Sequence, residues 1–442
     1  MFRRYMLIAT LILMIMIISI PVGIGENIFE ESRVPIPDNL PWYPIIVFGD
    51  NRPPNVQDLY PPLVYYDIIN ETKVINPIAV IGTGDHTGVG KEEQMDVFAE
   101  SLRGLENAWM ALGNHDLNYR KLGYWKNVIG PEYYYVDDIP GWRISVVNSD
   151  RYPKDRFLEQ VYYVLNTTDR SIIFVFHRPL YPYVRHNINE LGDGREHDLE
   201  VIISNRSNIK LVIQGHWHGY AVAKKGHVEY IVTGGAGAPL YDWPAVVRNA
   251  TDVVKGKYHY IVLILYPNGT YEYYPISVTG EIVIKELNET ASIILNNKTD
   301  IHGDPVNIPI RLKYEINGKT YYIVLMANNG ATIVNYKVIQ NTVLFYTNST
   351  KWYIYSPTTD PDVAKVYTDT EMLELWRSLL TTTTETPTET SPTTTTSPTT
   401  TTPSGTPTTS PVSDNTMIII GALILVIIIV SVSIVLIKKR GR

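Results

Sequence analysis

The chain of 442 residues contains no cysteine. This absence excludes disulfides, thiolate zinc sites and cysteine nucleophiles, so an exported domain built from this sequence must be stabilised mainly by its core. An excess of basic charge is also lacking, because 38 Lys and Arg residues face 45 Asp and Glu residues and the net charge is -7. No nucleic-acid-binding surface is therefore evident. The hydrophobic content of 45% is enough for more than one folded core.

Long apolar runs occur only at the two ends of the chain. Residues 1–25 begin with two arginines and continue as a nearly unbroken apolar stretch, which is the order of a secretory signal. No clear small-x-small cleavage site follows, so an uncleaved N-terminal anchor stays open as an alternative. Residues 417–437 carry no charge and are long enough to cross a bilayer as a helix. Basic residues follow at once at 438–442, which predicts a cytoplasmic C-terminus and an extracellular remainder.

Residues 381–413 are nearly all Thr, Ser and Pro. This composition cannot bury a core and predicts an extended stalk, with O-glycosylation as a plausible modification. The region before it carries eight Asn-x-Ser/Thr sequences, which indicate a glycosylated surface protein when they occur together with a signal and an anchor. They begin at Asn70, Asn166, Asn205, Asn249, Asn268, Asn288, Asn297 and Asn348.

From Pro44 onward, short β-branched runs alternate with helical patterns, which is typical of βαβ units. Polar residues repeatedly follow the carboxyl end of an apolar strand, where open α/β sheets build their sites. The predicted strands and the residues that follow them are 45–48 with Asp50, 78–81 with Asp85, 108–112 with Asn114, His115 and Asp116, 172–176 with His177, and 211–214 with His216 and His218. We expect these side chains to gather at one edge.

The later part of the chain has a different pattern. Antiparallel strands are predicted after Val228, with Asn268-Gly269 as a hairpin turn. Residues 281–370 contain short alternating strands rich in Ile, Val, Tyr and Thr, punctuated by Asn-Gly and Asn-Asn. The spacing predicts a small all-β sandwich of immunoglobulin-like type.

The polar residues at the strand ends offer carboxylate oxygen, amide oxygen and imidazole nitrogen, which are ligands for hard or borderline divalent metals. Two such metals roughly 3.5–4 Å apart can clamp the attacking and leaving oxygens of an in-line displacement. A carboxylate is the natural bridge between them. Taken singly, each motif is also compatible with an ordinary turn or a semi-buried histidine.

As an ordered set, the motifs resemble those of calcineurin-like metallophosphoesterases. The matching segments are Gly49-Asp50, Gly82-x-Gly84-Asp85, Gly113-Asn114-His115-Asp116, the strand-terminal His177 and Gly215-His216-x-His218. The resemblance covers residues 42–276. It implies an α/β fold in which a calcineurin-like β-sandwich is flanked by helices in four layers (αββα).

The resemblance also implies a role for each of these residues. Asp85 would bridge two divalent metal ions, which could be Mn, Zn, Fe or Co. Asn114, His177 and His216 would complete one metal site, while Asp50 and His218 would belong to the other. His115 would contact the phosphate and protonate the leaving oxygen, with Asp116 holding its orientation.

One position departs from the family pattern, because the residue two after the first aspartate is usually histidine and here is Arg52. A guanidinium stays protonated and cannot ligate a metal. Water or His86 could fill the vacancy, although His86 should point to the other side of its backbone. Arg52 could instead bind the substrate phosphate through its planar fork.

These observations predict a metal-dependent hydrolase that cleaves phosphate esters on the outer face of the cell membrane, anchored by a single C-terminal span. The substrate would be a phosphorylated small molecule or a lipid. The alternative is a catalytically impaired surface structural or adhesion protein that retains the phosphoesterase fold, and Arg52 is the evidence for it.

Overall fold

A computed structural model describes residues 27–118, 121–150, 154–183, 196–241, 249–339 and 342–357. The predicted N-terminal signal or anchor, the stalk and the C-terminal span lie outside these residues. Within the described ranges, no helix is both long enough and apolar enough to cross a membrane.

The first sheet has five strands in the order β12-β11-β1-β2-β3. Its central strands β1, β2 and β3 run parallel, and β11 and β12 add to the β1 edge in antiparallel fashion. Their bounds are β1 Tyr43–Phe48, β2 Ala79–Gly82, β3 Ala108–Met110, β11 His259–Leu265 and β12 Tyr271–Ser277. Every residue of β1 is buried, as expected for a strand covered on both faces.

Four helices accompany the first sheet along the chain: α2 Ile28–Glu31, α3 Leu63–Ile75, α4 Glu92–Leu102 and α5 Leu122–Val128. Tyr65 of α3 packs edge-on against Phe48 of β1, with ring centroids 5.8 Å apart. Helix α3 ends at Asn76, which adopts the left-handed conformation, and Pro77 follows. An asparagine tolerates that conformation and a proline cannot continue a helix, so the sequence itself ends α3 here.

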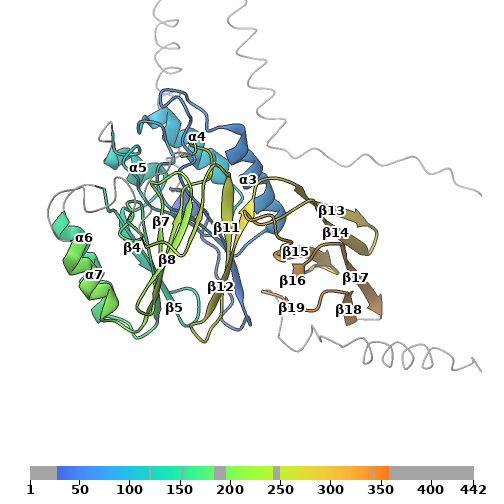
Figure 1. The fold of residues 1–442 in the computed structure, drawn as a ribbon. Coiled ribbons are helices and arrows are strands. Elements are labelled where there is room, and N and C mark those ends of the chain that lie inside the picture. The colour runs from blue at the N-terminus through green and yellow to red at the C-terminus, as the bar shows by residue number, and fades with distance from the viewer. Residues whose placement is uncertain are drawn as a thin grey trace, which may run out of the picture. The chain divides into compact units, whose positions relative to one another are not determined.

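The second sheet has seven strands in the order β10-β8-β9-β7-β6-β5-β4. Their bounds are β4 Tyr133–Val136, β5 Trp142–Val147, β6 Ser171–Phe176, β7 Ile209–Gln214, β8 Tyr220–Lys225, β9 Val228–Thr233 and β10 Asp252–Val254. Strand β9 runs parallel to β7 and antiparallel to β8, so the purely antiparallel arrangement predicted after Val228 is wrong for this strand. Helices α6 Lys154–Asn166 and α7 Glu196–Ser204 lie together beside this sheet (Figure 1).

The two sheets share one core, and the second sheet has another on its outer side. Along β6, Ile173 and Val175 belong to the core that also contains β1, whereas Phe174 and Phe176 belong to a cluster with Phe157 of α6. A strand with period 2 thus buries both of its faces, one against a sheet and one against helices. This confirms the two-sheet α/β architecture predicted from the sequence.

Beyond β12 the chain forms a β-sandwich with a four-stranded sheet in the order β13-β14-β17-β18 and a three-stranded sheet in the order β15-β16-β19. The bounds are β13 Glu281–Leu287, β14 Thr290–Asn296, β15 Ile308–Ile316, β16 Lys319–Ala327, β17 Ala331–Ile339, β18 Thr342–Thr347 and β19 Trp352–Tyr355. The predicted sandwich is confirmed.

The prediction that this sandwich is of immunoglobulin-like type is wrong in its strand order. An immunoglobulin domain places its third strand beside its sixth, whereas β15 here pairs with the next strand, β16. The reason is the two-residue turn Asn317-Gly318, in which both residues have positive φ (52° and 74°). Such turns close adjacent strands into a hairpin.

Arg311 of β15 joins the sandwich to the first sheet and its helices. Its guanidinium donates hydrogen bonds to the carbonyl of Asn76 at 2.9 Å, to the Asn76 side-chain oxygen at 2.8 Å and to Glu106 at 2.5 Å. Tyr355 of β19 accepts a further bond at 3.0 Å. The Arg311 side chain is only 4% exposed, so this buried cation is paired on several sides.

Two further contacts cross the same interface. Lys298, which is buried, reaches both carboxylate oxygens of Glu71 on α3, at 2.5 and 2.6 Å. The hydroxyl of Tyr353 donates to the Trp42 carbonyl at 2.9 Å. The charged groups Arg311 and Lys298 and the Tyr353 hydroxyl therefore all have partners across this interface.

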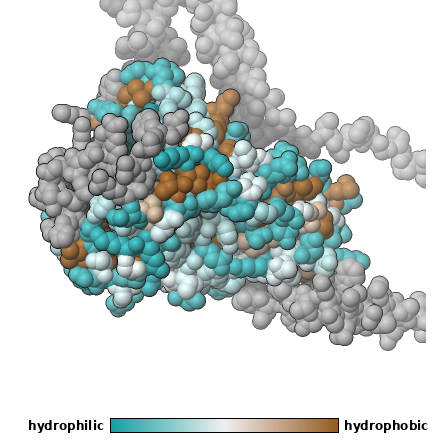
Figure 2. All heavy atoms as spheres, in the orientation of Figure 1, coloured by the Kyte–Doolittle hydropathy of each residue, from teal (hydrophilic) through white to brown (hydrophobic). Residues whose placement is uncertain are grey.

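The face of the molecule drawn in Figure 2 is mostly hydrophilic, with separate hydrophobic patches. Large apolar side chains that are more than half exposed include Tyr60 at 62% and Leu63 at 82%. Both lie in the segment that runs from β1 into α3.

Candidate metal centre

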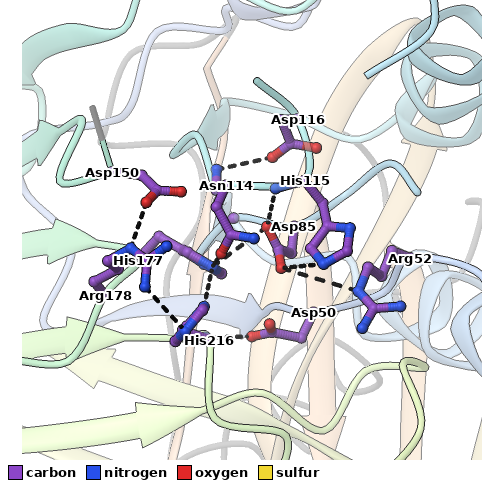
Figure 3. Close-up of polar contacts among 12 residues, drawn as sticks. Asp50, Arg52, Asp85, Asn114, His115, Asp116, Asp150, His177, Arg178 and His216 are labelled. Atoms are coloured by element: carbon purple, nitrogen blue, oxygen red, sulfur yellow. Dashed lines mark hydrogen bonds and ion pairs between the residues drawn. The ribbon is translucent and has the colours of Figure 1, made fainter. Parts of the chain in front are cut away.

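The polar residues predicted to meet do so in the loops that follow β1, β2, β3, β6 and β7. Since these strands are parallel within their sheets, their carboxyl ends reach the same edge. Figure 3 shows Asp50, Asp85, Asn114, His177 and His216 turned toward one another there. The structure thus brings together side chains that are up to 166 residues apart in the sequence.

Two groups of side chains at this edge could each hold a metal ion. In one group, donor atoms of Asp85, His177 and His216 all lie within 4.8 Å of one another. In the other, the same holds for Asp50, Asp85 and His218. Asp85 is common to both groups, so its carboxylate is placed to bridge two ions.

The first group has the spacing of a coordination shell. The Nε2 atom of His177 lies 3.0 Å from Nδ1 of His216, 3.3 Å from Oδ1 of Asp85 and 3.3 Å from Oδ1 of Asn114. Ligands about 2.0–2.1 Å from a tetrahedral metal are themselves roughly 3.3–3.4 Å apart. Asp85, Asn114, His177 and His216 therefore fit a divalent cation.

The second group contains a buried carboxylate oxygen that lacks a protein partner. Oδ1 of Asp50 lies 3.4 Å from Nε2 of His218. In the described part of the chain it accepts no hydrogen bond, although Asp50 is fully buried. Buried polar atoms are normally paired, and a cation between Asp50, Asp85 and His218 would supply the partner.

Backbone carbonyls orient three of the imidazoles. Nδ1 of His177 lies 2.9 Å from the Thr83 carbonyl, and Nδ1 of His218 lies 2.7 Å from the Pro239 carbonyl. Nδ1 of His115 lies 2.6 Å from the Gly88 carbonyl. A ring that donates from Nδ1 keeps its Nε2 lone pair for the centre, which is the usual arrangement around a metal.

The backbone is strained at the candidate ligands. Among the described residues other than glycine and asparagine, positive φ occurs only at Asp50 (57°), Asp85 (54°) and His216 (68°). Such conformations are rare for these residue types and concentrate at functional sites. The neighbouring glycines are needed for close approach, because a Cβ at Gly113 would lie 2.2 Å from Oδ1 of Asp85.

The charges at this edge are strongly coupled. Burial raises the pKa of Asp85, but the nearby imidazoles, first of all His177, outweigh it and hold that pKa well below the usual value. Burial lowers the pKa of His177, but Asp85 outweighs it and brings the pKa to about 9. At neutral pH the metal-free site thus holds a proton on His177 that a bound cation must displace.

A family model described as calcineurin-like phosphoesterase matches residues 43–220, a range that contains all six candidate ligands. The matched residues are similar to that family, and the two sheets continue beyond them to Ser277. No curated protein matches the chain.

The chain is also similar to solved structures. One is GAP50, titled the anchor in the inner membrane complex of Plasmodium, with 12% identity, a TM-score of 0.39, and coverage of 54% of this chain and 85% of that one. A dimetal phosphatase from Danio rerio has 11% identity, a TM-score of 0.37, and coverage of 54% and 99%. Vps29 complexed with zinc from Entamoeba histolytica has 15% identity, a TM-score of 0.30, and coverage of 53% and 93%. Similarity of this degree says nothing about the activity of this chain.

Arg52 lies beside Asp85, the carboxylate that the two donor groups share. Its Nε is 4.0 Å from Oδ2 of Asp85, and its side chain is 11% exposed. Within the described residues this buried Nε has no hydrogen-bond partner. An N–H group in this position is available to a ligand.

His86 does not fill the position of the missing imidazole, so that alternative is wrong. Its ring stacks on Phe98, with centroids 4.3 Å apart and planes 9° from parallel. Its Nδ1 lies 2.7 Å from Oδ1 of Asn51, and Gly84 donates its N–H to Nε2 at 3.3 Å. Burial lowers the pKa of His86 to about 3, so the ring is neutral and structural.

His115 lies where the resemblance predicts, but Asp116 does not contact its ring. Nε2 of His115 is 3.9 Å from Oδ2 of Asp85, and the side chain is 22% exposed. Asp116 instead accepts hydrogen bonds from the backbone of His86, Thr87 and Gly113. The prediction that Asp116 orients His115 is therefore wrong, because its carboxylate is used to join the loops that carry Asp85 and Asn114.

Two residues beside the centre, Arg178 and Asp150, were not among the predicted site residues. The Arg178 guanidinium pairs with Asp150, which is 3% exposed, and extends one nitrogen to 3.3 Å from Nε2 of His216. Figure 3 shows this pair on the opposite side of Asp85 from Arg52. The available signal was position, since Asp150 follows the end of β5 and Arg178 follows His177.

Trp217, between the two histidines, packs in the interior. It is fully buried in a small cluster with Ala221 and Val232. The segment around it is a tight turn, in which Trp217 donates to the Gly215 carbonyl at 2.8 Å and Gly219 donates to the Trp217 carbonyl at 2.7 Å. This turn, rather than an extended segment, directs His216 and His218 to one centre.

Proposed function

We propose that this chain is a metal-dependent phosphoesterase that hydrolyses phosphate esters at a centre bridged by Asp85. The observation that carries the proposal is the shared position of Asp85 in two donor groups of a calcineurin-like phosphoesterase domain. Divalent cations held there would supply Lewis-acid charge for the phosphoryl oxygens and activate water. Two such ions, of Mn, Zn, Fe or Co, are the cofactors we propose.

The protein groups around the centre suit an ester carrying negative charge. Arg52 presents a buried N–H beside Asp85, and its fork can bind phosphate oxygens. His115 is held through Nδ1 by the Gly88 carbonyl, so its Nε2 faces the same space. When both ring nitrogens are protonated, Nε2 can donate to the leaving oxygen, as a general acid does.

We further propose an extracellular, membrane-anchored location. The apolar segment at 417–437 and the basic residues after it support this topology. All eight asparagines of the Asn-x-Ser/Thr sequences are exposed, as glycosylation requires. In this proposal residues 42–276 are the catalytic domain, 281–370 the sandwich and 381–413 the stalk, and the substrate is a phosphorylated small molecule or lipid.

The test is turnover of p-nitrophenyl phosphate and bis(p-nitrophenyl) phosphate by the full-length chain, purified in detergent, with Mn, Zn, Fe, Co or no added metal. We expect metal-dependent release of p-nitrophenol that Asp85→Asn abolishes. The ratio of monoester to diester turnover begins to define the substrate. Absence of turnover with every metal, together with absence of bound metal, would contradict the proposal and favour a surface structural protein.

A further inference from the structure

We infer that the two halves of the centre bind divalent metal with unequal affinity, because Arg52 takes the place of a ligand in the second half. The first half, which binds metal tightly, consists of Asp85, Asn114, His177 and His216. The second half, which binds metal at least ten-fold more weakly, consists of Asp50, Asp85 and His218. This inference rests on the proposed function and concerns how its metal centre is loaded.

The ligand count differs between the halves. The first half surrounds Nε2 of His177 with three other donor atoms, all at 3.0–3.3 Å. In the second half, Asp50 and His218 are 3.4 Å apart and share only Asp85 as a third protein ligand. Among the described residues no further histidine or carboxylate joins them, since His86 stacks on Phe98 instead.

The charge distribution also differs between the halves. Arg52 places a permanent positive charge 4.0 Å from Oδ2 of Asp85. A second cation on that side would meet this charge in a buried place, where Coulomb repulsion is strong. Arg52 thereby cancels much of the benefit of the additional carboxylate of Asp50.

Arg52 is fixed in this position by its surroundings. Its backbone N–H donates to the Asp85 carbonyl at 3.1 Å, and one guanidinium nitrogen donates to the Pro53 carbonyl at 3.3 Å. Gln94 of α4 holds the following loop by donating to the carbonyls of Val56 and Asp58. The backbone around Arg52 is therefore held in place, and the guanidinium cannot move away when a metal arrives without breaking its bond to the Pro53 carbonyl.

The experiment counts bound metal directly. The full-length chain in detergent is stripped with chelator and dialysed against increasing Mn²⁺, and the bound ion is measured by elemental analysis and electron paramagnetic resonance. We expect one tight equivalent and a second that binds at least ten-fold more weakly. Arg52→His, which removes the charge and adds an imidazole, should bring the second equivalent to within a few-fold of the first. Arg52→Leu, which only removes the charge, should lie between the two.

Ligand variants assign the tight equivalent to one half. Asn114→Ala should lose it, whereas Asp50→Asn should keep it. Two equivalents of equal affinity in the unaltered chain, or a tight equivalent lost in Asp50→Asn and kept in Asn114→Ala, would overturn the inference while leaving the proposed function intact. Failure to bind Mn²⁺ would overturn the inference, and failure to bind Zn, Fe and Co as well would overturn the proposed function too.

Discussion

The metal centre and the interface with the sandwich are both built from buried charged groups, but they treat those groups differently. At the interface, Arg311 and Lys298 each reach a carboxylate, and Arg311 also has carbonyl and hydroxyl partners. At the centre, Asp50, Arg52 and Asp150 each keep one buried atom without a hydrogen-bond partner. They are the only charged residues in the described part of the chain that do so. Complete pairing contributes to stability, and incomplete pairing leaves capacity for a ligand.

Among variants that keep the proposed metal ligands, the largest effect on activity should come from His115→Gln, whose side chain is 22% exposed. We expect turnover of p-nitrophenyl phosphate to fall by roughly 10²–10⁴-fold, the usual contribution of a general acid. Mn²⁺ content and the midpoint of thermal unfolding should stay the same. A variant that loses metal together with activity would show that His115 is structural.

The largest effect on stability should come from Arg311→Met at the interface. Removing one partner of a buried, multiply bonded pair costs about 3–5 kcal/mol of unfolding free energy. The matched control is Lys313→Met on the same strand, where the cation is 52% exposed and a change of at most about 1 kcal/mol is expected. Chemical denaturation measures both. An equal loss of unfolding free energy in Arg311→Met and Lys313→Met would contradict the view that pairing at the interface contributes to stability.

A smaller effect should follow from Asp150→Asn, which removes the charged partner of Arg178 beside His216. By analogy with groups that support metal ligands, we expect roughly a 10–100-fold loss of turnover or metal affinity. The Mn²⁺ concentration for half-maximal turnover distinguishes a loss of metal affinity, which raises that concentration, from a loss of turnover alone, which does not. Asp137→Asn is the control, because Asp137 pairs with Arg143 away from the centre and should leave that concentration unchanged.

The smallest effect concerns pH and a buried histidine that has partners on both ring nitrogens. His259 lies 3.0 Å from the Lys257 carbonyl and 3.1 Å from the Thr233 hydroxyl, and burial lowers its pKa to about 4. The unfolded chain binds this proton more readily, so the stability that the neutral ring confers is complete above about pH 6.5 and is lost as the pH falls toward 4.

We expect this group to account for roughly 1–2 kcal/mol of the loss in unfolding free energy between pH 7 and 5. His259→Gln should show a shallower decline over that range in denaturant unfolding. An identical pH dependence in the two proteins would mean that His259 binds its proton equally well in the folded and unfolded chains.

Much of the architecture could be read from the sequence because local rules agree with the fold. Apolar runs predicted the central strands, and Asn268-Gly269 lies at the turn between β11 and β12. Helices α2, α3, α5 and α7 were not predicted. The strand order of the sandwich was wrong, since spacing alone does not say whether a strand pairs with its neighbour or with a later strand.

The candidate site was only partly visible in the sequence. Polar residues just after predicted strands pointed to Asp50, Asp85 and His177, because that position recurs at sites in α/β sheets. Arg178 and Asp150 were missed because an Arg–Asp pair has no spacing signature. The orientation of Asp116 was assigned by resemblance, and the contacts of its carboxylate contradict that assignment.

By itself, the sequence determined the kinds of ligands available and their position at the ends of strands. It also determined that Arg52 stands where an imidazole is usual. These points follow from residue identity and strand periodicity. Tertiary structure alone decided that Asp85 is shared by two donor groups, that His86 faces away from them and that Arg52 lies 4.0 Å from the shared carboxylate. The physical reason is that side-chain direction at a strand end depends on backbone angles, such as the positive φ of Asp50, Asp85 and His216, and these are imposed by packing across two sheets.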